Sequence, residues 1–186
     1  MARLADLRAA GVTAATMTRM ANEGEVLRLA RGLYQLADAE LHAQHSLAEA
    51  AARVPKGIIC LTSALALHCL TDQLPRKVWI AIDLNDWAPE PSSPPPRIVR
   101  MPNALLGDGV ETHTIEGVRV KMFSITRTIA DCFRHRRSAG LSIAPEGLQE
   151  ALRQRKLTLA TMSRQAMKSG VATVVRPYLE ALTANA

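Results

Sequence analysis

The pattern of apolar and polar positions near the start of the chain predicts two helices followed by a hairpin. Apolar residues with helical spacing precede Gly11, which is a natural end for the first helix. A second helix follows, with Thr13 as its N-cap and Met17 on its inner face. Two short apolar strands then flank a turn, at residues 26–29 and 33–36. This order of elements is typical of a winged helix-turn-helix.

An Ala-rich helical pattern comes next, over residues 39–54, and Pro55 and Gly57 end it. Strand-like apolar stretches then dominate the middle of the chain, at residues 58–61, 78–82, 98–101, 111–115 and 118–123. A short helix interrupts them at residues 63–70, with Thr62 or Ser63 as its cap.

The hydrophobic period becomes helical from Ser124 onward. Thr126 is the expected cap of a helix that runs to about residue 136, and further helices are expected at residues 145–156, 159–168 and 173–183. The predicted fold class is therefore α+β: a small N-terminal winged helix-turn-helix followed by an α+β domain with its strands early and its helices late. The predicted divisions are a winged helix over residues 1–38, a connecting helix over residues 39–55, and an α+β domain over residues 56–186.

Composition indicates a folded chain and restricts the kind of surface and the cellular compartment that are expected. Hydrophobic residues make up 48% of the sequence and aromatic residues only 3%, which permits an aliphatic core but argues against a surface that stacks single-stranded bases. The three cysteines, Cys60, Cys69 and Cys132, form no CxxC pair, which fits free thiols in a reducing compartment. No apolar signal core or bilayer-length segment is evident, so a cytoplasmic protein without a membrane partner is expected.

Charge is unevenly distributed along the chain. The formal net charge is +6, yet residues 1–40 are neutral, whereas residues 119–176 hold twelve basic side chains and three acidic ones. Such a surplus is either a solvated helical surface or a face that attracts an acidic partner or nucleic acid. The basic face expected to bind a partner consists of Arg134, Arg136, Arg137, Arg153, Arg155 and Lys156.

Four stretches together resemble one protein family. Residues 11–36 read GVTAATMTRMANEGEVLRLARGLYQL, and the later stretches read ICLTSALALH from Ile59, PRKVWIAI from Pro75 and SITRTIAD from Ser124. This series is similar to the AbiEi family, the antitoxins of type IV toxin–antitoxin systems. The resemblance implies an antitoxin that represses its own operon through the winged helix and counteracts a nucleotidyltransferase-like toxin. Operator DNA and that cognate toxin are the implied partners, a homodimer is left open, and no enzymatic activity or cofactor is expected.

The outward face of the second helix carries side chains suited to the major groove. Thr and Ala contact the thymine methyl group and Arg binds guanine, so the expected DNA-reading residues are Ala15, Thr16, Arg19 and Asn22. Arg28 and Arg31 of the wing are expected to meet phosphates or the minor groove. The alternative is a protein-interaction module with a solvated outer face. Winged helices of this type usually have a further helix ahead of the two expected here, whereas only ten residues precede Gly11. Either packing on residues 39–54 completes this shortened module, or the module binds DNA weakly.

The competing hypothesis is an enzyme that modifies nucleic acid or nucleotides with Asp83, Asp86 and Asp131 and the basic C-terminal helices. Against it, no carboxylate is followed closely by Lys on a predicted strand, as a nuclease would usually show. Arg127 and Asp131 are four residues apart on a helix, which favours a structural ion pair. His and Cys residues lack the spacing of a four-ligand site, so no metal is expected.

Overall fold

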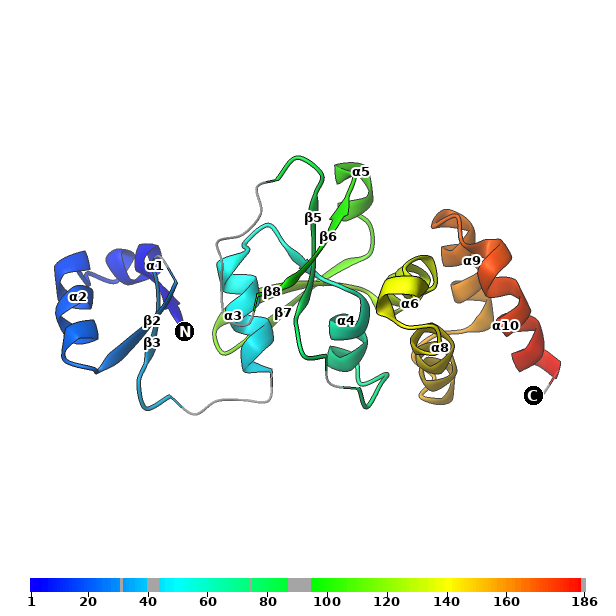
Figure 1. The fold of residues 1–186 in the computed structure, drawn as a ribbon, viewed down its shortest axis with the longest axis horizontal. Helices are drawn as coiled ribbons and strands as arrows, with labels where there is room; N and C mark the ends of the chain where they lie inside the picture. Colours follow the sequence, from blue (N-terminus) through cyan, green and yellow to red (C-terminus); the bar gives the residue numbers. More distant parts are fainter. Residues whose placement is uncertain (31, 40–43, 74, 87–94, 185–186) are drawn as a thin grey trace.

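The computed structural model describes residues 1–30, 32–39, 44–73, 75–86 and 95–184. Figure 1 shows an elongated molecule with three parts in a row: an N-terminal module, a central sheet with helices beside it, and a group of C-terminal helices. The strands lie in the first two thirds of the chain and most of the helices follow them. The predicted α+β class is therefore confirmed.

The N-terminal module contains a small antiparallel sheet and two helices. Its elements are β1 (Ala2–Arg3), α1 (Leu4–Ala9), α2 (Ala14–Asn22), β2 (Val26–Ala30) and β3 (Leu33–Leu36), with the strand order β1-β3-β2. The helices cover one face of this sheet, and Met17, Val26 and Tyr34 are the buried residues between them. The sequence pattern did not reveal β1, because two residues are too few to show a period of two.

The central sheet has five strands, in the order β6-β5-β4-β8-β7. These are β4 (Ile58–Ile59), β5 (Trp79–Asp83), β6 (Arg97–Met101), β7 (Val110–Ile115) and β8 (Val118–Phe123). The β4–β8 and β5–β6 pairs are parallel, whereas β4–β5 and β7–β8 are antiparallel. The β7–β8 hairpin turns at Glu116 and Gly117, both of which have positive φ, as a tight turn of this kind requires.

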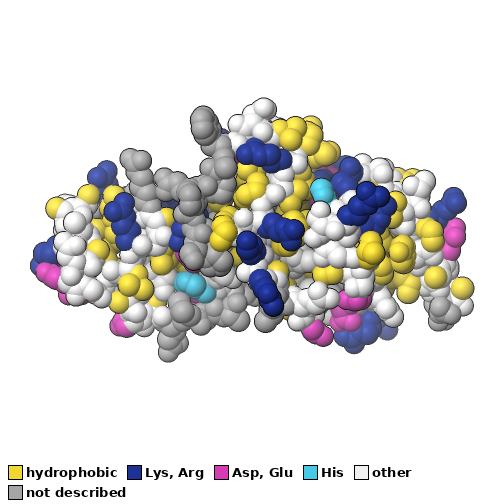
Figure 2. Space-filling view, in the orientation of Figure 1, with side chains coloured by type: hydrophobic (Ala, Val, Ile, Leu, Met, Phe, Trp, Pro, Cys, Tyr) yellow, Lys and Arg dark blue, Asp and Glu magenta, His cyan; other side chains and the backbone are white. Residues whose placement is uncertain are grey.

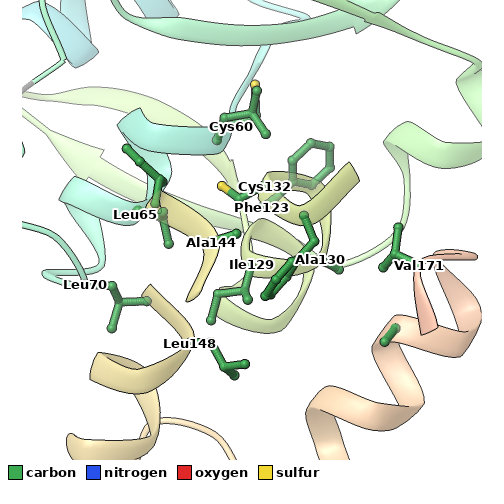
Figure 3. Packing of buried hydrophobic residues seen from close by; sticks show 14 of the residues in the cluster. Cys60, Leu65, Leu70, Phe123, Ile129, Ala130, Cys132, Ala144, Leu148 and Val171 are labelled. Carbon is green, nitrogen blue, oxygen red and sulfur yellow. The ribbon is translucent and has the colours of Figure 1, made fainter. Parts of the chain in front are cut away.

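Alternating residues of the central strands face two different hydrophobic cores. Ile59 and Ile80 pack in the core beneath α3 (His45–Arg53), while Ile58 and Trp79 pack in the larger core on the other face. This alternation is the period of two that a sheet covered on both faces requires. The larger core continues from the sheet into α4 (Leu61–Leu67) and the C-terminal helices, as Figure 3 shows for Leu65, Phe123 and Leu148.

Helix α3 differs from its prediction in length. The sequence predicts a connecting helix from residue 39, but the helix begins at His45, with Ala39 and Gln44 outside it and residues 40–43 outside the described part of the chain. Its apolar residues contact β8 and share a core with the central strands. Packing against the sheet thus ties α3 to the central part of the molecule.

The C-terminal helices form a layered group beyond the sheet. They are α6 (Ile125–Arg134), α7 (Arg136–Ala139), α8 (Ile143–Arg153), α9 (Leu159–Lys168) and α10 (Ala172–Ala184), and a short α5 (Asn103–Leu106) precedes β7. Buried Phe133 links α6 to α10, because its ring centroid lies 5.1 Å from that of Tyr178. Among the described residues, no helix combines the length and the apolar character needed to cross a bilayer.

Two predicted helix caps are wrong. Helix α4 begins at Leu61 with Cys60 as its N-cap, so neither Thr62 nor Ser63 caps it. The Ser63 hydroxyl accepts a hydrogen bond from the Trp79 backbone amide instead, at 3.0 Å. Helix α6 begins directly after Ser124, which places Thr126 inside it. Before α4 the strand ends at Ile59, earlier than the apolar run over residues 58–61 suggests, and the helix starts in its place. Before α6 the strand ends at Phe123 as predicted, and the helix begins two residues later, with Ser124 as its N-cap.

Candidate nucleic-acid interface

Helix α2 is held in place by interactions that the sequence predicts. The Thr13 side chain accepts a hydrogen bond from the Thr16 backbone amide at 3.1 Å, which makes Thr13 the N-cap. Met17 is 4% exposed and packs on Val26 and Tyr34, with Val12 beside them. Helix α2 therefore has one anchored face and one face directed away from the module's core.

The outward face carries the predicted DNA-reading residues. Ala15, Arg19 and Asn22 are exposed, and Thr16 is half-buried, with its hydroxyl 2.9 Å from that of Thr13. Arg19 lies 3.9 Å from Glu23, but these side chains are 68% and 46% exposed. An exposed pair of this kind contributes little, so Arg19 remains available to another partner.

The predicted wing is the β2–β3 hairpin. Arg28 is exposed on β2, opposite Tyr34, and the register shifts between Arg28 and Ala30. This irregularity bends the strand just before the turn. Arg31, the second predicted wing cation, lies outside the described residues.

The other face of the module's sheet is directed toward the rest of the chain. Leu33 is 2% exposed and lines a cleft of about 510 Å³ together with Ala51 and Ala52 of α3. Three cations also line this cleft: Arg3 of β1 and, from β8, Arg119 and Lys121. Sequence reasoning missed this set, because only the docking of the module beside the central sheet brings residues from β1 and β8 together.

The six residues of the predicted basic face fall into two groups at opposite ends of α8. Arg134, Arg136 and Arg137 precede the start of this helix, while Arg153, Arg155 and Lys156 are at its end or just beyond it. A helix of eleven residues is about 16 Å long. Figure 2 shows Lys and Arg side chains spread along the length of the visible face.

Three of these six cations bind carbonyl groups at the ends of helices. Arg134 donates to the Ser169 carbonyl after α9, Arg136 donates to the Phe133 carbonyl at 3.0 Å, and Lys156 donates to the His68 carbonyl after α4 at 2.6 Å. The last carbonyls of a helix lack intrahelical partners and carry partial negative charge, so cations stabilise them. These three residues have a structural role that does not depend on a partner.

The remaining cations of this set differ in availability. Arg153 pairs with Glu150, and hydrogen bonds from Arg153 and Gln154 lower the pKa of Glu150 to about 2. The side chains of Arg137 and Arg155 are exposed and form no ion pair or hydrogen bond within the part of the chain that the structure describes. They are the two members of the basic face that are free to meet a partner.

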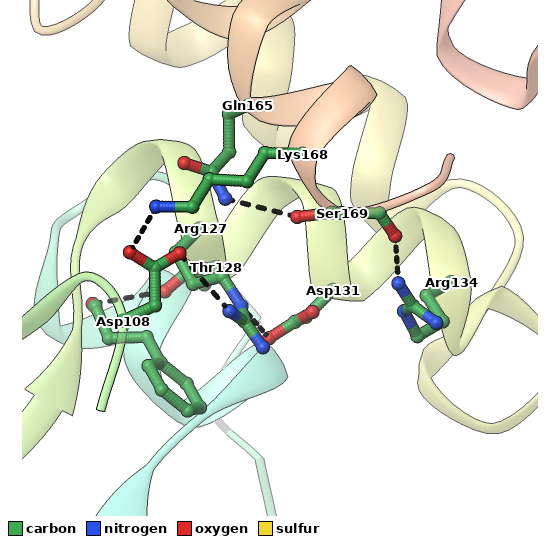
Figure 4. A network of polar contacts seen from close by, with 9 residues as sticks. Asp108, Arg127, Thr128, Asp131, Arg134, Gln165, Lys168 and Ser169 are labelled. Carbon is green, nitrogen blue, oxygen red and sulfur yellow. Dashed lines mark hydrogen bonds and ion pairs between the residues drawn. The ribbon is translucent and has the colours of Figure 1, made fainter. Parts of the chain in front are cut away.

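A network of charged side chains, two of them buried, surrounds Arg127 (Figure 4). Arg127 Nε donates to Asp131 Oδ2 at 2.8 Å, and Arg127 Nη1 lies 3.6 Å from Asp108 Oδ2. Asp108 also binds Lys168 of α9 at 2.5 Å, and this hydrogen bond lowers the pKa of Asp108. Burial raises the pKa of Asp131, while Arg127 opposes that shift. Arg127 and Asp131 are 5% and 1% exposed, and through Asp108 the network joins α6 to the segment before β7 and to α9.

Asp83 and Asp86 of the enzyme hypothesis lie on one turn at the end of β5, where the Asp86 amide donates to the Asp83 carbonyl at 3.2 Å, whereas Asp131 lies in α6. Asp83 Oδ1 accepts from the Asn85 amide at 2.9 Å, Asp86 lies 3.4 Å from Lys56, and Asp131 is buried beside Arg127. Within the described ranges, no group of three or more His, Cys, Asp or Glu side chains could hold a metal ion. The structure thus brings no acidic cluster together from these residues.

Ser63 and His68 on and after α4 also have structural partners. His68 Nε2 lies 2.9 Å from the Phe123 carbonyl, and burial lowers the pKa of this imidazole. Ser63 accepts from the Trp79 amide, as described above. Ser63 therefore anchors α4 to the start of β5, and His68 anchors it to the end of β8.

Comparison with known proteins bears on the N-terminal module. No curated protein matches the chain. Residues 1–37 match the family described as "Transcriptional regulator, AbiEi antitoxin", and this segment contains β1, both helices of the module and both strands of the hairpin. The N-terminal module is therefore similar to the AbiEi antitoxin transcriptional regulators, which confirms the resemblance over residues 1–37.

Proposed function

We propose that this protein is the antitoxin of a type IV toxin–antitoxin system and a transcriptional autorepressor that acts in the cytoplasm. The exposed face of α2 carries this proposal, because an anchored helix presents Ala15, Arg19 and Asn22 outward from a segment similar to a transcriptional regulator. A helix of this size fits the major groove, where such side chains contact base edges.

Arg19 and Arg28 have different roles in the proposed complex. Arg19 contacts a base, with Ala15, Thr16 and Asn22 beside it, whereas Arg28 and Arg31 of the wing contact phosphates or the minor groove. Base contacts provide sequence specificity, and phosphate contacts provide salt-dependent affinity. The neutral charge of residues 1–40 implies that few phosphate contacts come from the module itself.

Gel-shift titrations with the protein's own promoter, at several salt concentrations, test the proposal. Arg19→Ala is expected to weaken promoter binding by about 1 to 3 kcal/mol and to relax specificity. Arg28→Ala is expected to weaken promoter and random DNA alike and to reduce the salt slope by about 1. Arg164→Ala, which removes an exposed arginine of α9, is the matched control. Equal binding of promoter and random DNA by the unaltered protein would contradict autorepression.

We place toxin neutralisation on a surface separate from the DNA-reading face. The surplus of basic side chains lies beyond residue 119, on elements that a winged helix does not need. Among the predicted basic face, Arg137 and Arg155 are free to attract an acidic surface of a nucleotidyltransferase-like toxin, or the nucleic acid on which it acts. The proposed partners are thus operator DNA and this cognate toxin.

Charge reversal separates the two surfaces. Arg137→Glu combined with Arg155→Glu is expected to impair protection from the induced toxin and to spare repression of a promoter reporter. Arg19→Ala is expected to do the opposite. These reversals avoid Arg134, Arg136 and Lys156, whose loss would also remove bonds at helix ends. If the double reversal leaves protection unchanged while Arg19→Ala abolishes it, the two-surface proposal is wrong.

A further inference from the structure

A second basic site lies far along the chain from the DNA-reading face, between α4, α7 and the first residues of β5 and β6. It is a cavity of about 500 Å³, lined by Thr62, Gln73, Arg76, Lys77, Trp79 and Arg97 together with residues of α7 and α8. A cavity of this size is in the usual range for small-molecule sites and is too small for a protein helix or a duplex.

Of the residues that the structure describes, three cations line this cavity and no acidic side chain does. Arg76 and Lys77 are exposed and precede β5, while Arg97 begins β6. Among the described residues, none of these three side chains forms an ion pair or a hydrogen bond. They therefore differ from the cations of the C-terminal helices, most of which are already bound to carbonyls or carboxylates.

Arg97 is held in position by the strand beside it. Trp79 and Arg97 are directly opposite on the parallel strands β5 and β6, and the Arg97 guanidinium carbon lies 4.4 Å from the centroid of the Trp79 ring. Trp79 itself is 6% exposed, and its backbone amide donates to Ser63. Contact with an anchored aromatic ring orders a guanidinium without neutralising it, so its donors remain available to an anion.

A buried hydroxyl completes the cavity wall. Thr62 is 6% exposed, and its Oγ1 has no hydrogen-bond partner among the described residues. A buried polar atom without a partner is uncommon in a folded protein and requires an explanation. Rotation of the Thr62 side chain, whose Oγ1 is closed off from solvent, would turn this hydroxyl toward a ligand oxygen in the cavity and give it a partner.

We propose that this cavity binds a phosphate-type oxyanion of a small molecule, held by Arg76, Lys77 and Arg97 and by the Thr62 hydroxyl. Guanidinium and ammonium groups form short, charge-assisted hydrogen bonds with phosphate oxygens, and a neutral hydroxyl adds direction. The site is independent of the proposed DNA-reading face, because the two share no residue.

Isothermal titration calorimetry on the full chain, with ionic strength held constant by chloride, tests this proposal. Inorganic phosphate and adenosine triphosphate are the two probes, and saturable binding at one site is expected for at least one of them. Equal affinities would identify free phosphate as a sufficient ligand, whereas tighter binding of the triphosphate would identify a nucleotide. Bound ligand should also raise the melting temperature as its concentration increases.

Variants assign the binding to this cavity. Arg76→Gln and Lys77→Gln are each expected to weaken binding about tenfold, as the loss of a charge-assisted hydrogen bond does. Thr62→Val is expected to weaken it about fivefold. Because Thr62 Oγ1 has no partner among the described residues, this variant should retain or raise the melting temperature of the unliganded protein. Arg164→Gln is the matched control and should leave binding unchanged.

Three results would overturn the proposal. The first is the absence of saturable binding of either probe. The second is equal weakening by Arg164→Gln and Arg76→Gln, which would indicate diffuse attraction to a basic protein. The third is binding of a single-stranded oligonucleotide without binding of phosphate or triphosphate, which would make the cavity part of a nucleic-acid surface.

Discussion

The N-terminal module and the C-terminal helices use their charged side chains in opposite ways. The module is neutral, yet Arg19 and Arg28 are exposed and lack a strong partner. The C-terminal region has a large basic surplus, yet several of its cations bind the carbonyls that end other helices. Formal charge along a sequence therefore does not measure how many cations are free to bind a partner.

The two regions also differ in how their cores are built. Among the described residues, the module's core contains three buried side chains, Met17, Val26 and Tyr34, whereas the large core extends continuously from the central sheet to α10. A small folded unit buries a smaller fraction of its surface than a large one, so its core provides little stability by itself. We therefore expect core substitutions to act globally in the C-terminal region and locally in the module.

The largest effect is expected from Phe133→Ala. Phe133 is 1% exposed and contacts the Tyr178 ring, so its truncation should lower the free energy of unfolding by about 3 to 5 kcal/mol. Chemical denaturation monitored by circular dichroism measures this loss. Tyr178→Ala is the control on the other side of the contact and should cost less, since Tyr178 is 40% exposed. Equal losses of unfolding free energy in the two variants would indicate that Tyr178 of α10 contributes as much to stability as the buried Phe133 of α6.

Breaking the buried ion pair should have the next largest effect. Asp131→Ala leaves the Arg127 guanidinium buried without its nearest carboxylate, which should cost about 3 kcal/mol. The double variant Arg127→Met with Asp131→Leu should recover much of this loss, because it removes both charges. A double variant less stable than Asp131→Ala would show that Arg127 or Asp131 stabilises the fold through contacts other than their mutual ion pair.

A smaller and local effect is expected at the cap of α2. Thr13→Ala removes the side chain that accepts from the Thr16 amide and should cost about 1 kcal/mol. Amide hydrogen exchange should accelerate in α2 and leave α6 unchanged, since the two helices belong to different cores. Thr18→Ala, an exposed position inside the same helix, is the matched control. Faster exchange in both helices would mean that the module and the central part unfold together.

The smallest effect concerns pH. Burial lowers the pKa of His68 in the folded state, so the unfolded chain binds more protons than the folded chain as pH falls through 6.5. Stability contributed by neutral His68 is present above that value and should be lost progressively on acidification below it. Urea midpoints at pH 7.5 and pH 5.5 measure the change, and His68→Gln should reduce it. An unchanged pH dependence in this variant would assign it to other groups, among them His135, the pKa of which is also lowered by burial.

Much of the module could be predicted from the sequence, because its determinants act over short distances. Thr13 caps α2 three residues from the amide that it binds, and Gly11, with positive φ, lies where the first helix has ended. The Arg127–Asp131 pair likewise spans one helical turn. The assignment of Ala15, Thr16, Arg19, Asn22, Arg28 and Arg31 to DNA remains a prediction.

Only the tertiary structure decided which distant residues meet. The cavity joins Thr62, Arg76 and Arg97 because β5 and β6 pair in parallel and α4 packs beside them. The basic residues that are near one another in sequence instead separate to the two ends of α8. The sequence by itself determined most of the local elements, among them the cap of α2 and the Arg127–Asp131 pair, since these contacts depend on a few neighbouring residues. Strand order, the start of α3 and the carbonyl partners of Arg134 and Lys156 depend on contacts between distant segments, which no local pattern encodes.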